Sequence, residues 1–276
     1  MITYFCLMLA LKYLLKAPYS LLRSAQGRTL LWLFWQYGGK RRYQPTHVSF
    51  GRYRLEVPDC FSWLWQYEEI YVEEFYKFKT PNPTPLIYDC GANVGMSILY
   101  FKELYPNATI KAFEAEPTIA AYLRKNLINN PIEGVEIIEK AVWINNEGVW
   151  FGEGQADDAS IYGQGQKKLI PSLRLRDELA KEPLVDFLKI DIEGAEIEVL
   201  PDCTEILDRV QHLFVEFHAY IDEPQALAKV IEVIEQAGFR YYIDTNQHRK
   251  APFVNRRYRN NKVMDLQLNI SAWREK

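Results

Sequence analysis

The sequence lacks the cysteine pattern of a metal-binding or disulfide-bonded module. Its four cysteines, Cys6, Cys60, Cys90 and Cys203, lie far apart, and no Cys-x-x-Cys pair or Cys/His cluster occurs. Structural zinc sites need closely spaced ligands, and disulfide scaffolds are typical of short secreted chains. The cysteine spacing therefore argues against both and favours a reduced, cytoplasmic location.

The sequence also lacks an excess of positive charge. Its 33 Lys and Arg residues stand against 36 Asp and Glu residues, which gives a net charge of −3 at pH 7. Proteins that bind nucleic acid through its phosphates carry a basic surface. We therefore expect a small-molecule partner and no nucleic acid, and self-association into a homo-oligomer stays open.

A hydrophobic run long enough to cross a membrane is missing as well. Residues 2–11 are apolar, but Lys12 interrupts them, and a spanning helix needs about 20 apolar residues. A secretory signal would show positive charge before the run and small residues at a cleavage site, and neither occurs. A second apolar stretch at 30–35 is followed by three basic residues at 40–42. Residues 1–42 therefore predict either a peripheral membrane contact or a helical cap packed on the main domain or on a second subunit.

What the sequence does contain is enough material for one large α/β domain and a smaller segment. It has 276 residues, of which 48% are hydrophobic. Residues 48–80 are rich in aromatic side chains, which favours a role in core packing. The proline-rich run 80–85 is the best boundary in the chain. We expect an N-terminal helical and aromatic extension over 1–80 and a main domain over 81–276.

After residue 85, short apolar runs alternate with helical patterns. The alternation predicts a mostly parallel, doubly wound sheet, which binds ligands at the carboxyl ends of its strands. Residues 145–170 are rich in glycine and polar residues and predict a hairpin and loop excursion. The expected strands are 86–90, 108–113, 135–142, 185–191, 212–217, 239–243 and 263–270, and the expected helices are 96–105, 117–130, 173–180, 194–207 and 224–237.

The first strand is followed by the loop Asp89-Cys-Gly-Ala-Asn-Val-Gly-Met-Ser97. It is no dinucleotide fingerprint, because Asn93 and Met96 stand where Gly-x-Gly-x-x-Gly needs its second and third glycines. It is no phosphate-binding loop either, because no Gly-Lys-Ser/Thr follows. An acid before a glycine loop suits a cationic ligand better. We expect Asp89 to hold an ammonium group, and a sulfonium cofactor with an amino-acid tail is the obvious candidate.

Further acids follow the next strands. Glu114 ends the second strand, where a carboxylate can accept both ribose hydroxyls of a nucleoside, and Glu116 could substitute for it. Asp191 and Glu193 follow the buried strand 185–191. In the next strand, Glu216 and His218 are two residues apart and share a face. We expect the last four to meet in one crevice, with His218 as a catalytic candidate.

Together these motifs resemble the FkbM family of S-adenosylmethionine-dependent methyltransferases, over about residues 85–245. The most distinctive piece is Leu188-Lys-Ile-Asp-Ile-Glu-Gly-Ala-Glu196. The resemblance implies a seven-stranded class I methyltransferase sheet and O-methylation of a sugar or secondary-metabolite hydroxyl. It implies that Glu114 binds the ribose of S-adenosylmethionine and that Ala141 lies near the adenine. It also implies that the methionine part of the cofactor is surrounded by Asp89, Gly91, Asn93, Gly95 and Ser97, with Asp191 beside them.

A hydroxyl acceptor needs a base within hydrogen-bond reach. His218 is the first candidate, assisted by Glu216, and Asp191 and Glu193 are the alternatives. The same residues could instead hold a divalent cation that lowers the pKa of the hydroxyl. The acid-free stretch 248–259 could bind an anionic acceptor or an anionic membrane surface, or be a solvated loop.

Two other functions remain open at this stage. One is a non-catalytic binding or scaffold protein on a methyltransferase fold. The other is a nucleic-acid methyltransferase. Enzymes that methylate amino groups of bases often carry an Asn/Asp-Pro-Pro-Tyr/Phe string after the fourth strand, and here that place reads Asp191-Ile-Glu-Gly.

Overall fold

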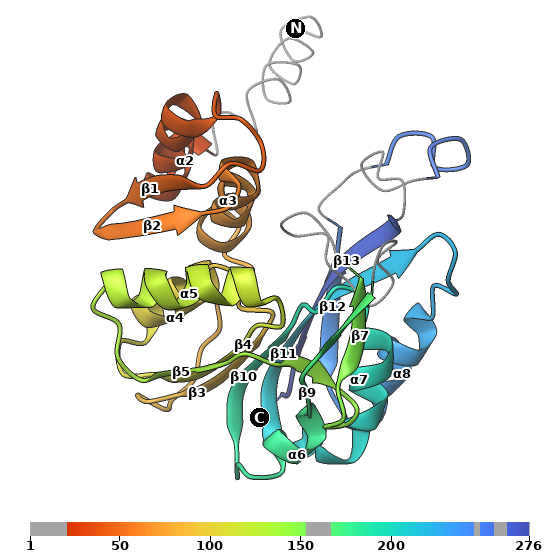
Figure 1. Cartoon of the computed structure of the whole chain (residues 1–276). Coiled ribbons are helices and arrows are strands. Elements are labelled where there is room, and N and C mark those ends of the chain that lie inside the picture. Colours follow the sequence, from red (N-terminus) through yellow and green to blue (C-terminus); the bar gives the residue numbers. More distant parts are fainter. Residues whose placement is uncertain (1–20, 153–166, 246–248, 257–263, 276) are drawn as a thin grey trace, which may run out of the picture. The chain divides into compact units, whose positions relative to one another are not determined.

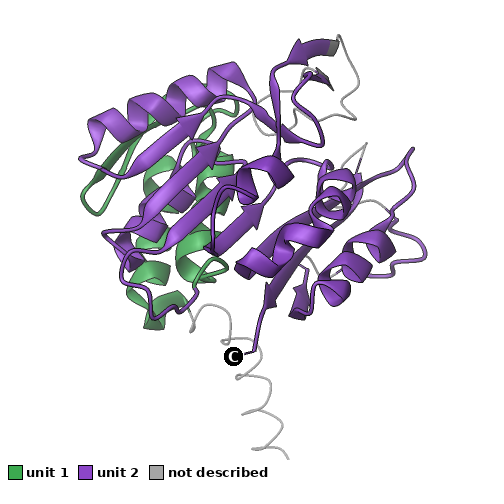
Figure 2. Cartoon of the chain, turned by 90° about the horizontal axis from the view of Figure 1, so that it is seen from below, with its two compact units in different colours: residues 1–77 green, residues 78–276 purple. Residues whose placement is uncertain are grey.

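The structure is a computed structural model and describes residues 21–152, 167–245, 249–256 and 264–275. The chain forms two compact units, residues 1–77 and 78–276, which Figure 2 distinguishes by colour. The boundary falls just before the proline-rich run that the sequence offers as a linker. The apolar run 2–11 lies outside the described residues.

The smaller unit combines helices with a β-hairpin around an aromatic core. It contains α2 (Ala25–Tyr37), β1 (Thr46–Phe50), β2 (Tyr53–Val57), α3 (Cys60–Tyr67) and a π-helical turn (Glu68–Val72). Phe50 packs edge-on against the rings of Tyr67 and Tyr71, with centroids 5.4 and 5.3 Å away. The aromatic residues thus pack in a core, as the sequence predicts, but the antiparallel pairing of β1 with β2 was not predicted.

The larger unit is built on a seven-stranded sheet. Its strands are β3 (Leu86–Cys90), β4 (Thr109–Phe113), β5 (Val135–Ile138), β10 (Val185–Ile190), β11 (Val210–Tyr220), β12 (Arg240–Asp244) and β13 (Met264–Trp273). The order across the sheet is β12-β13-β11-β10-β3-β4-β5 (Figure 1). β13 runs antiparallel to both of its neighbours, and the other pairs are parallel. This is the class I methyltransferase sheet, so the predicted fold class is confirmed.

The order of the strands creates a switch point between β3 and β10. From β3 the chain moves outward through α4 (Met96–Leu104) and α5 (Pro117–Asn129). From β10 it moves outward in the opposite direction through α7 (Glu196–Asp202) and α8 (Leu227–Gln236). Right-handed crossovers therefore place the two helix pairs on opposite faces of the sheet, as Figure 1 shows. Ligands of doubly wound sheets bind where the direction reverses.

One excursion leaves the sheet between β5 and β10. The single strand expected at 135–142 is broken, because the chain turns at Glu139 and Lys140, which are exposed. Its second part, β6 (Ala141–Trp143), pairs with β9 (Ser172–Arg174) in a separate small sheet. The predicted hairpin is formed by β7 (Val149–Gly152) and β8 (Lys167–Ile170). A short helix, α6 (Leu175–Leu179), leads back to the sheet.

The core of the larger unit centres on β10, whose six residues are all buried. Leu188 and Ile190 pack with Val215 of β11 in one apolar cluster. Asp186 of the same strand is buried but satisfied, since it accepts hydrogen bonds from Thr80 and Asn82 at 2.7 and 2.9 Å. The proline-rich run is thereby tied to the sheet.

The cysteines and the apolar segments can now be compared with the structure. Cys60, Cys90 and Cys203 are buried free thiols, and Cys6 lies outside the described residues. Among the residues that the structure describes, no helix combines the length and the apolar character that crossing a bilayer requires.

Candidate active site

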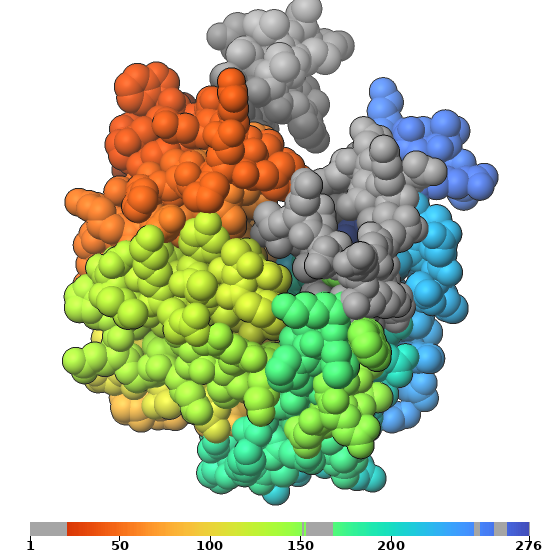
Figure 3. Space-filling model, viewed as in Figure 1, coloured from red at the N-terminus to blue at the C-terminus, as the bar shows by residue number. Residues whose placement is uncertain are grey.

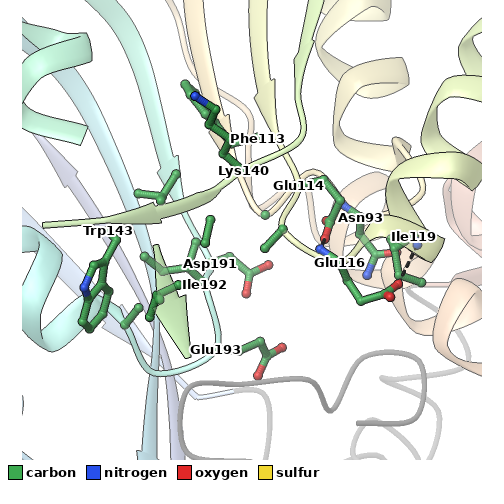
Figure 4. A pocket seen from close by; sticks show the side chains of 16 residues that line it. Asn93, Phe113, Glu114, Glu116, Ile119, Lys140, Trp143, Asp191, Ile192 and Glu193 are labelled. Atoms are coloured by element: carbon green, nitrogen blue, oxygen red, sulfur yellow. Dashed lines mark hydrogen bonds between the residues drawn. The ribbon is translucent and has the colours of Figure 1, made fainter. Parts of the chain in front are cut away.

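A pocket opens at the carboxyl ends of β3, β4 and β10, at the switch point of the sheet. It encloses about 750 Å³, including the part that is open to solvent. Figure 4 shows Asp191 and Glu193 on one side of it and Asn93, Glu114 and Glu116 on the other. The residues that line it are Gly91, Asn93, Phe113, Glu114, Ala115, Glu116, Ile119, Lys140, Ala141, Val142, Trp143, Val149, Asp191, Ile192, Glu193 and Ala195.

The floor of the pocket depends on the absence of a side chain at Gly91. This residue has a φ of +87°, and a Cβ atom there would lie 1.8 Å from the carbonyl oxygen of Asp191. The backbones are that close because the N–H of Asp191 donates to the carbonyl oxygen of Cys90 at 3.1 Å. Only glycine permits this approach of the β3 and β10 ends.

The structure places Asp89 away from the pocket, in the interior. Its side chain is fully buried and accepts a hydrogen bond of 2.5 Å from Ser97 Oγ. Lys189 Nζ lies 3.4 Å from the other carboxylate oxygen. The residue expected to hold an ammonium group of the ligand is therefore already engaged with an internal ammonium group. Ser97 and Gly95 likewise do not line the pocket, whereas Gly91 and Asn93 do.

Lys189 is a site residue that the sequence analysis missed. Its side chain is buried, and its ammonium group lies 3.0 Å from Asp191 and donates to the carbonyl oxygen of Gly91 at 2.8 Å. It thus connects the end of β10 to the glycine loop after β3. The available signal was a lysine inside a buried strand, because a buried ammonium group requires partners.

Glu114 lies at the end of β4 and reaches the glycine loop. One carboxylate oxygen accepts a hydrogen bond from the backbone N–H of Asn93 at 2.9 Å, and the other accepts one from Glu116 N at 3.0 Å. Each oxygen keeps a lone pair for a further donor. Burial raises the pKa of Glu114 to about 7, although the two N–H groups act in the opposite direction. Glu116 caps α5 by accepting from Ile119 N at 2.7 Å.

Asp191 and Glu193 form the acidic side of the pocket. They follow β10 in a loop where Glu193 has a φ of +54°, which is uncommon for a residue other than glycine. Such backbone strain persists where the surrounding structure enforces it, and it is frequent at functional sites. Tyr220 Oη donates to the backbone carbonyl of Glu193 at 3.3 Å. The strained loop aims the Glu193 carboxylate into the pocket (Figure 4).

His218 is brought next to this loop, as the sequence predicts for the ends of neighbouring strands, but it is buried behind it. Its side chain is 2% exposed and does not line the pocket. Nε2 lies 3.7 Å from a carboxylate oxygen of Glu193 and 3.7 Å from one of Glu216. Nδ1 lies 3.3 Å from Glu196, a fully buried residue to which the sequence analysis gave no role. Glu216 also accepts a hydrogen bond from Gln267.

The charges in this cluster change one another's proton affinity. Burial acts to lower the pKa of His218, but the carboxylates of Glu193, Glu196 and Glu216 outweigh it and raise that pKa well above its usual value. Burial raises the pKa of Glu193 well above its usual range, His218 opposes this, and Asp191 adds to it. The pKa of Glu216 is raised in the same way. The three carboxylates thus favour the protonated form of His218, and His218 in turn favours the ionised form of Glu193.

The same side chains fit a divalent cation. Asp191, Glu193 and His218 each present one ligand atom, and the three atoms lie within 4.8 Å of one another. Carboxylate oxygens with one imidazole suit magnesium, manganese or iron. A cation would bind Nε2 of His218 only after this nitrogen has lost its proton.

The remaining wall of the pocket is apolar. Ala141 lines the pocket, and its place near an adenine ring stays a prediction. Val142 and Trp143 of β6 also line the pocket, and Ile119 of α5 lines it on the other side, beside Glu116 (Figure 4). None of the three was predicted, because they come from α5 and from the small β6–β9 sheet. An apolar wall opposite a few carboxylates is typical of a small-molecule site.

Comparison with known proteins points to one family. The family model described as Methyltransferase FkbM domain matches residues 89–241. Methyltransferase sdnD of Sordaria araneosa is 29% identical over 214 residues, which cover 63% of this chain and 80% of that protein. The 31-O-demethyl-FK506 methyltransferase FkbM of Streptomyces tacrolimicus is 24% identical over 213 residues, covering 63% and 80%.

Two further matches are less extensive or more distant. The 2-O-methyltransferase NoeI of Sinorhizobium fredii is 27% identical over 157 residues, which cover 49% of this chain and 64% of that protein. The solved structure of methyltransferase FkbM from Methylobacillus flagellatus is 13% identical. Its TM-score is 0.43, and the match covers 76% of this chain and 53% of that one.

Proposed function

The chain belongs to the FkbM methyltransferase family, and from this premise we propose that it transfers a methyl group from S-adenosylmethionine to a hydroxyl group of a small molecule. The observation that carries the proposal is the pocket at the switch point. Carboxylates at the ends of two strands, Glu114 and Glu193, face one space from opposite sides. One side suits a nucleoside, and the other suits a hydroxyl that must lose its proton.

The cofactor side is assigned to the glycine loop and β4. Glu114 would accept the two ribose hydroxyls with the lone pairs that its backbone partners leave free. Gly91 and Asn93, with Asp191 across from them, would hold the amino-acid part, and Ala141 would lie along the adenine. Bound there, S-adenosylmethionine supplies an electrophilic methyl group on a sulfonium. Asp89 and Ser97 would act through Lys189 and α4 by shaping the loop, without touching the ligand.

On the acceptor side we assign the base to Glu193. It lines the pocket, and its raised pKa brings a carboxylate closer to the range where it can take a proton at neutral pH. His218, the first candidate from the sequence, does not line the pocket, and its raised pKa favours the protonated form, which cannot accept a proton. Its role would be to hold Glu193 in place and to limit how far the pKa of that carboxyl rises. Glu216 and Glu196 would in turn orient His218.

A divalent cation is the alternative for the same cluster. Held by Asp191, Glu193 and His218, it would lower the pKa of the acceptor hydroxyl, and no separate base would be needed. Turnover in the presence of a chelator separates the two. Unchanged turnover is expected if Glu193 acts as a base. Loss of turnover that Mg²⁺ or Mn²⁺ restores would identify the metal mechanism instead.

The acceptor is proposed as a sugar or a secondary metabolite with a free hydroxyl. The names of two relatives support O-methylation: one is a 2-O-methyltransferase, and the other is a 31-O-demethyl-FK506 methyltransferase. The pocket combines apolar side chains with a few carboxylates, as small-molecule sites do. With an acidic chain and an acidic pocket, a nucleic-acid acceptor is disfavoured.

The experiment that tests this proposal is transfer of a labelled methyl group from S-adenosylmethionine to a panel of sugars and hydroxylated metabolites. Glu193→Gln should keep cofactor binding and lose about 10²–10⁴-fold in turnover. Glu136→Gln makes the same charge change at an exposed position on β5 and should leave turnover unchanged. Cofactor binding without transfer to any acceptor would favour the non-catalytic alternative. Equal turnover in Glu193→Gln would remove Glu193 as the base.

A further inference from the structure

A short loop after β12 exposes two large apolar side chains. The side chains of Phe253 and Val254 are 89% and 80% exposed, among the highest values for large hydrophobic residues in the described chain. In Figure 3 the blue atoms of residues 249–256 stand out from the surface beside them. Isolated exposed apolar residues are common on proteins, but an adjacent pair at the tip of a projecting loop is typical of a contact surface.

The loop is held in shape by its own hydrogen bonds. The N–H groups of Val254 and Asn255 both donate to the carbonyl oxygen of Ala251 at 2.9 Å. Arg249 donates to the carbonyl oxygen of Arg256 at 3.0 Å, which closes the loop, and to the carbonyl oxygen of Asp265 on β13, which ties it to the sheet. The apolar tip is therefore presented by an ordered turn that is anchored to the larger unit.

The charged residues of the loop 249–256 are all cations: Arg249, Lys250 and Arg256. Between residues 245 and 264 the sequence contains six Lys and Arg residues and no Asp or Glu, although the whole chain has a net charge of −3. Within the described part, Lys250 and Arg256 are exposed on either side of the apolar pair. An apolar pair between cations matches the boundary of an anionic bilayer, where acyl chains lie next to head-group phosphates.

The sheet topology shows at which edge of the sheet the loop lies. β12 runs parallel to β11 and β10, so the chain enters the loop at the carboxyl edge of the sheet, the edge that carries the pocket. Contact through the loop would turn this edge of the larger unit towards the partner surface. The loop and the pocket thus lie at the same edge of the sheet, where a docking element for a surface-bound acceptor is expected.

The smaller unit shows the same combination independently. On α2 the side chains of Leu31, Trp32 and Trp35 are 42%, 47% and 84% exposed, and their spacing places them on one face of the helix. Exposed Lys40 and Arg41 follow the helix. Tryptophan beside basic residues is favoured at membrane–water interfaces. Each unit thus carries its own surface of this chemistry.

We propose that the loop 249–256 docks the protein on an anionic phospholipid surface. Phe253 and Val254 enter the interfacial layer, and Lys250 and Arg256 pair with head-group phosphates. The α2 face offers the same chemistry on the smaller unit. The inference is independent of the proposed methyl transfer, because it concerns lipid binding and not turnover. It commits to a membrane, and an anionic soluble acceptor or an acidic protein are the competing occupants.

Sedimentation of the full chain with lipid vesicles tests the proposal. Phosphatidylcholine vesicles with and without phosphatidylserine provide the charge comparison. We expect binding to the anionic vesicles that salt weakens, and little binding to the neutral ones. Phe253→Ser with Val254→Ser should reduce the partition coefficient at least about tenfold, and Lys250→Gln should reduce it about fivefold.

Matched control variants distinguish binding through the loop from non-specific binding through any exposed apolar or cationic side chain. Ile128→Ser removes an 82% exposed apolar side chain from α5, and Lys229→Gln removes an exposed cation from α8. Both should bind vesicles like the parent. The proposal is overturned if the parent does not bind anionic vesicles, or if the loop variants bind as well as the controls. Circular dichroism of each variant verifies that the fold is intact.

Discussion

At the scale of single residues, burial of the carboxylates sets the protonation states in the site. Glu114 shows this most clearly, since its two oxygens accept backbone N–H groups and burial still raises its pKa to about 7. A carboxylate with this pKa is ionised above pH 7 and protonated below it. Only the ionised form offers both oxygens as acceptors to a ribose.

The affinity for S-adenosylmethionine should therefore depend on pH. As the pH falls below about 7, the dissociation constant should rise towards tenfold for each pH unit, because a growing fraction of Glu114 carries a proton. Titration calorimetry between pH 5.5 and about pH 8.5 measures this. Glu114→Gln should bind weakly at every pH and lose the dependence. A flat profile in the parent protein would contradict the assignment of Glu114 to the ribose.

The role of His218 can also be tested through pH. If it acts by holding a positive charge beside Glu193, His218→Gln should shift the acidic limb of the kcat profile to higher pH, because the Glu193 carboxyl loses the charge that opposes its raised pKa. Turnover at high pH should fall much less than in Glu193→Gln. Abolished turnover at every pH, with cofactor binding intact, would instead make His218 the base.

At the scale of elements, the joint between β3 and β10 decides the shape of the pocket. The strands pair in a register that sets Lys189 opposite Asp89. The ammonium group of Lys189 lies between the carboxylates of Asp89 and Asp191. This arrangement couples the glycine loop after β3 to the acidic loop after β10.

Removing Lys189 should destabilise the larger unit. Lys189→Met leaves Asp89 buried with no opposite charge, and breaking a buried ion pair in this way costs about 3–5 kcal/mol. Lys181→Met, at a lysine whose side chain is 60% exposed, should change the free energy of unfolding by less than about 0.5 kcal/mol. Chemical denaturation of the two variants measures the difference. Equal stability would show that the buried pair contributes nothing to this joint.

The elements also show what a sequence can and cannot provide. Alternation of apolar runs with helical patterns was enough to predict the parallel sheet and the position of Glu114, Asp191 and Glu193 at strand ends. It could not place Asp89, because the direction of a strand-end side chain depends on its neighbour's register, and here that neighbour carries Lys189. The break at Glu139–Lys140 was missed because both parts of 135–142 form strands, but in different sheets.

At the scale of the whole molecule, the candidate site belongs to one of the two units. Every residue of the pocket comes from the larger unit, between Gly91 and Ala195. That unit has its own continuous apolar core. The sequence of the smaller unit predicted no catalytic function. Its aromatic residues predict packing in a core, but they do not identify the residues they pack against. Its hairpin was signalled only by short-range alternation around Gly51.

A fragment of residues 78–276 should therefore fold and bind S-adenosylmethionine. Because no pocket residue is removed, its dissociation constant should stay within about threefold of the full chain's. Circular dichroism and calorimetric titration of the fragment measure both properties. A folded fragment that does not bind would mean that the smaller unit completes the site.

The most direct test of the account is calorimetric titration of S-adenosylmethionine into the full chain and into Glu114→Gln at a pH above 8. The account predicts saturable one-site binding to the parent protein and at least about tenfold weaker binding to the variant, because two hydrogen bonds to a charged acceptor are lost. Failure of the well-folded parent to bind, or equal affinity in both proteins, would contradict it.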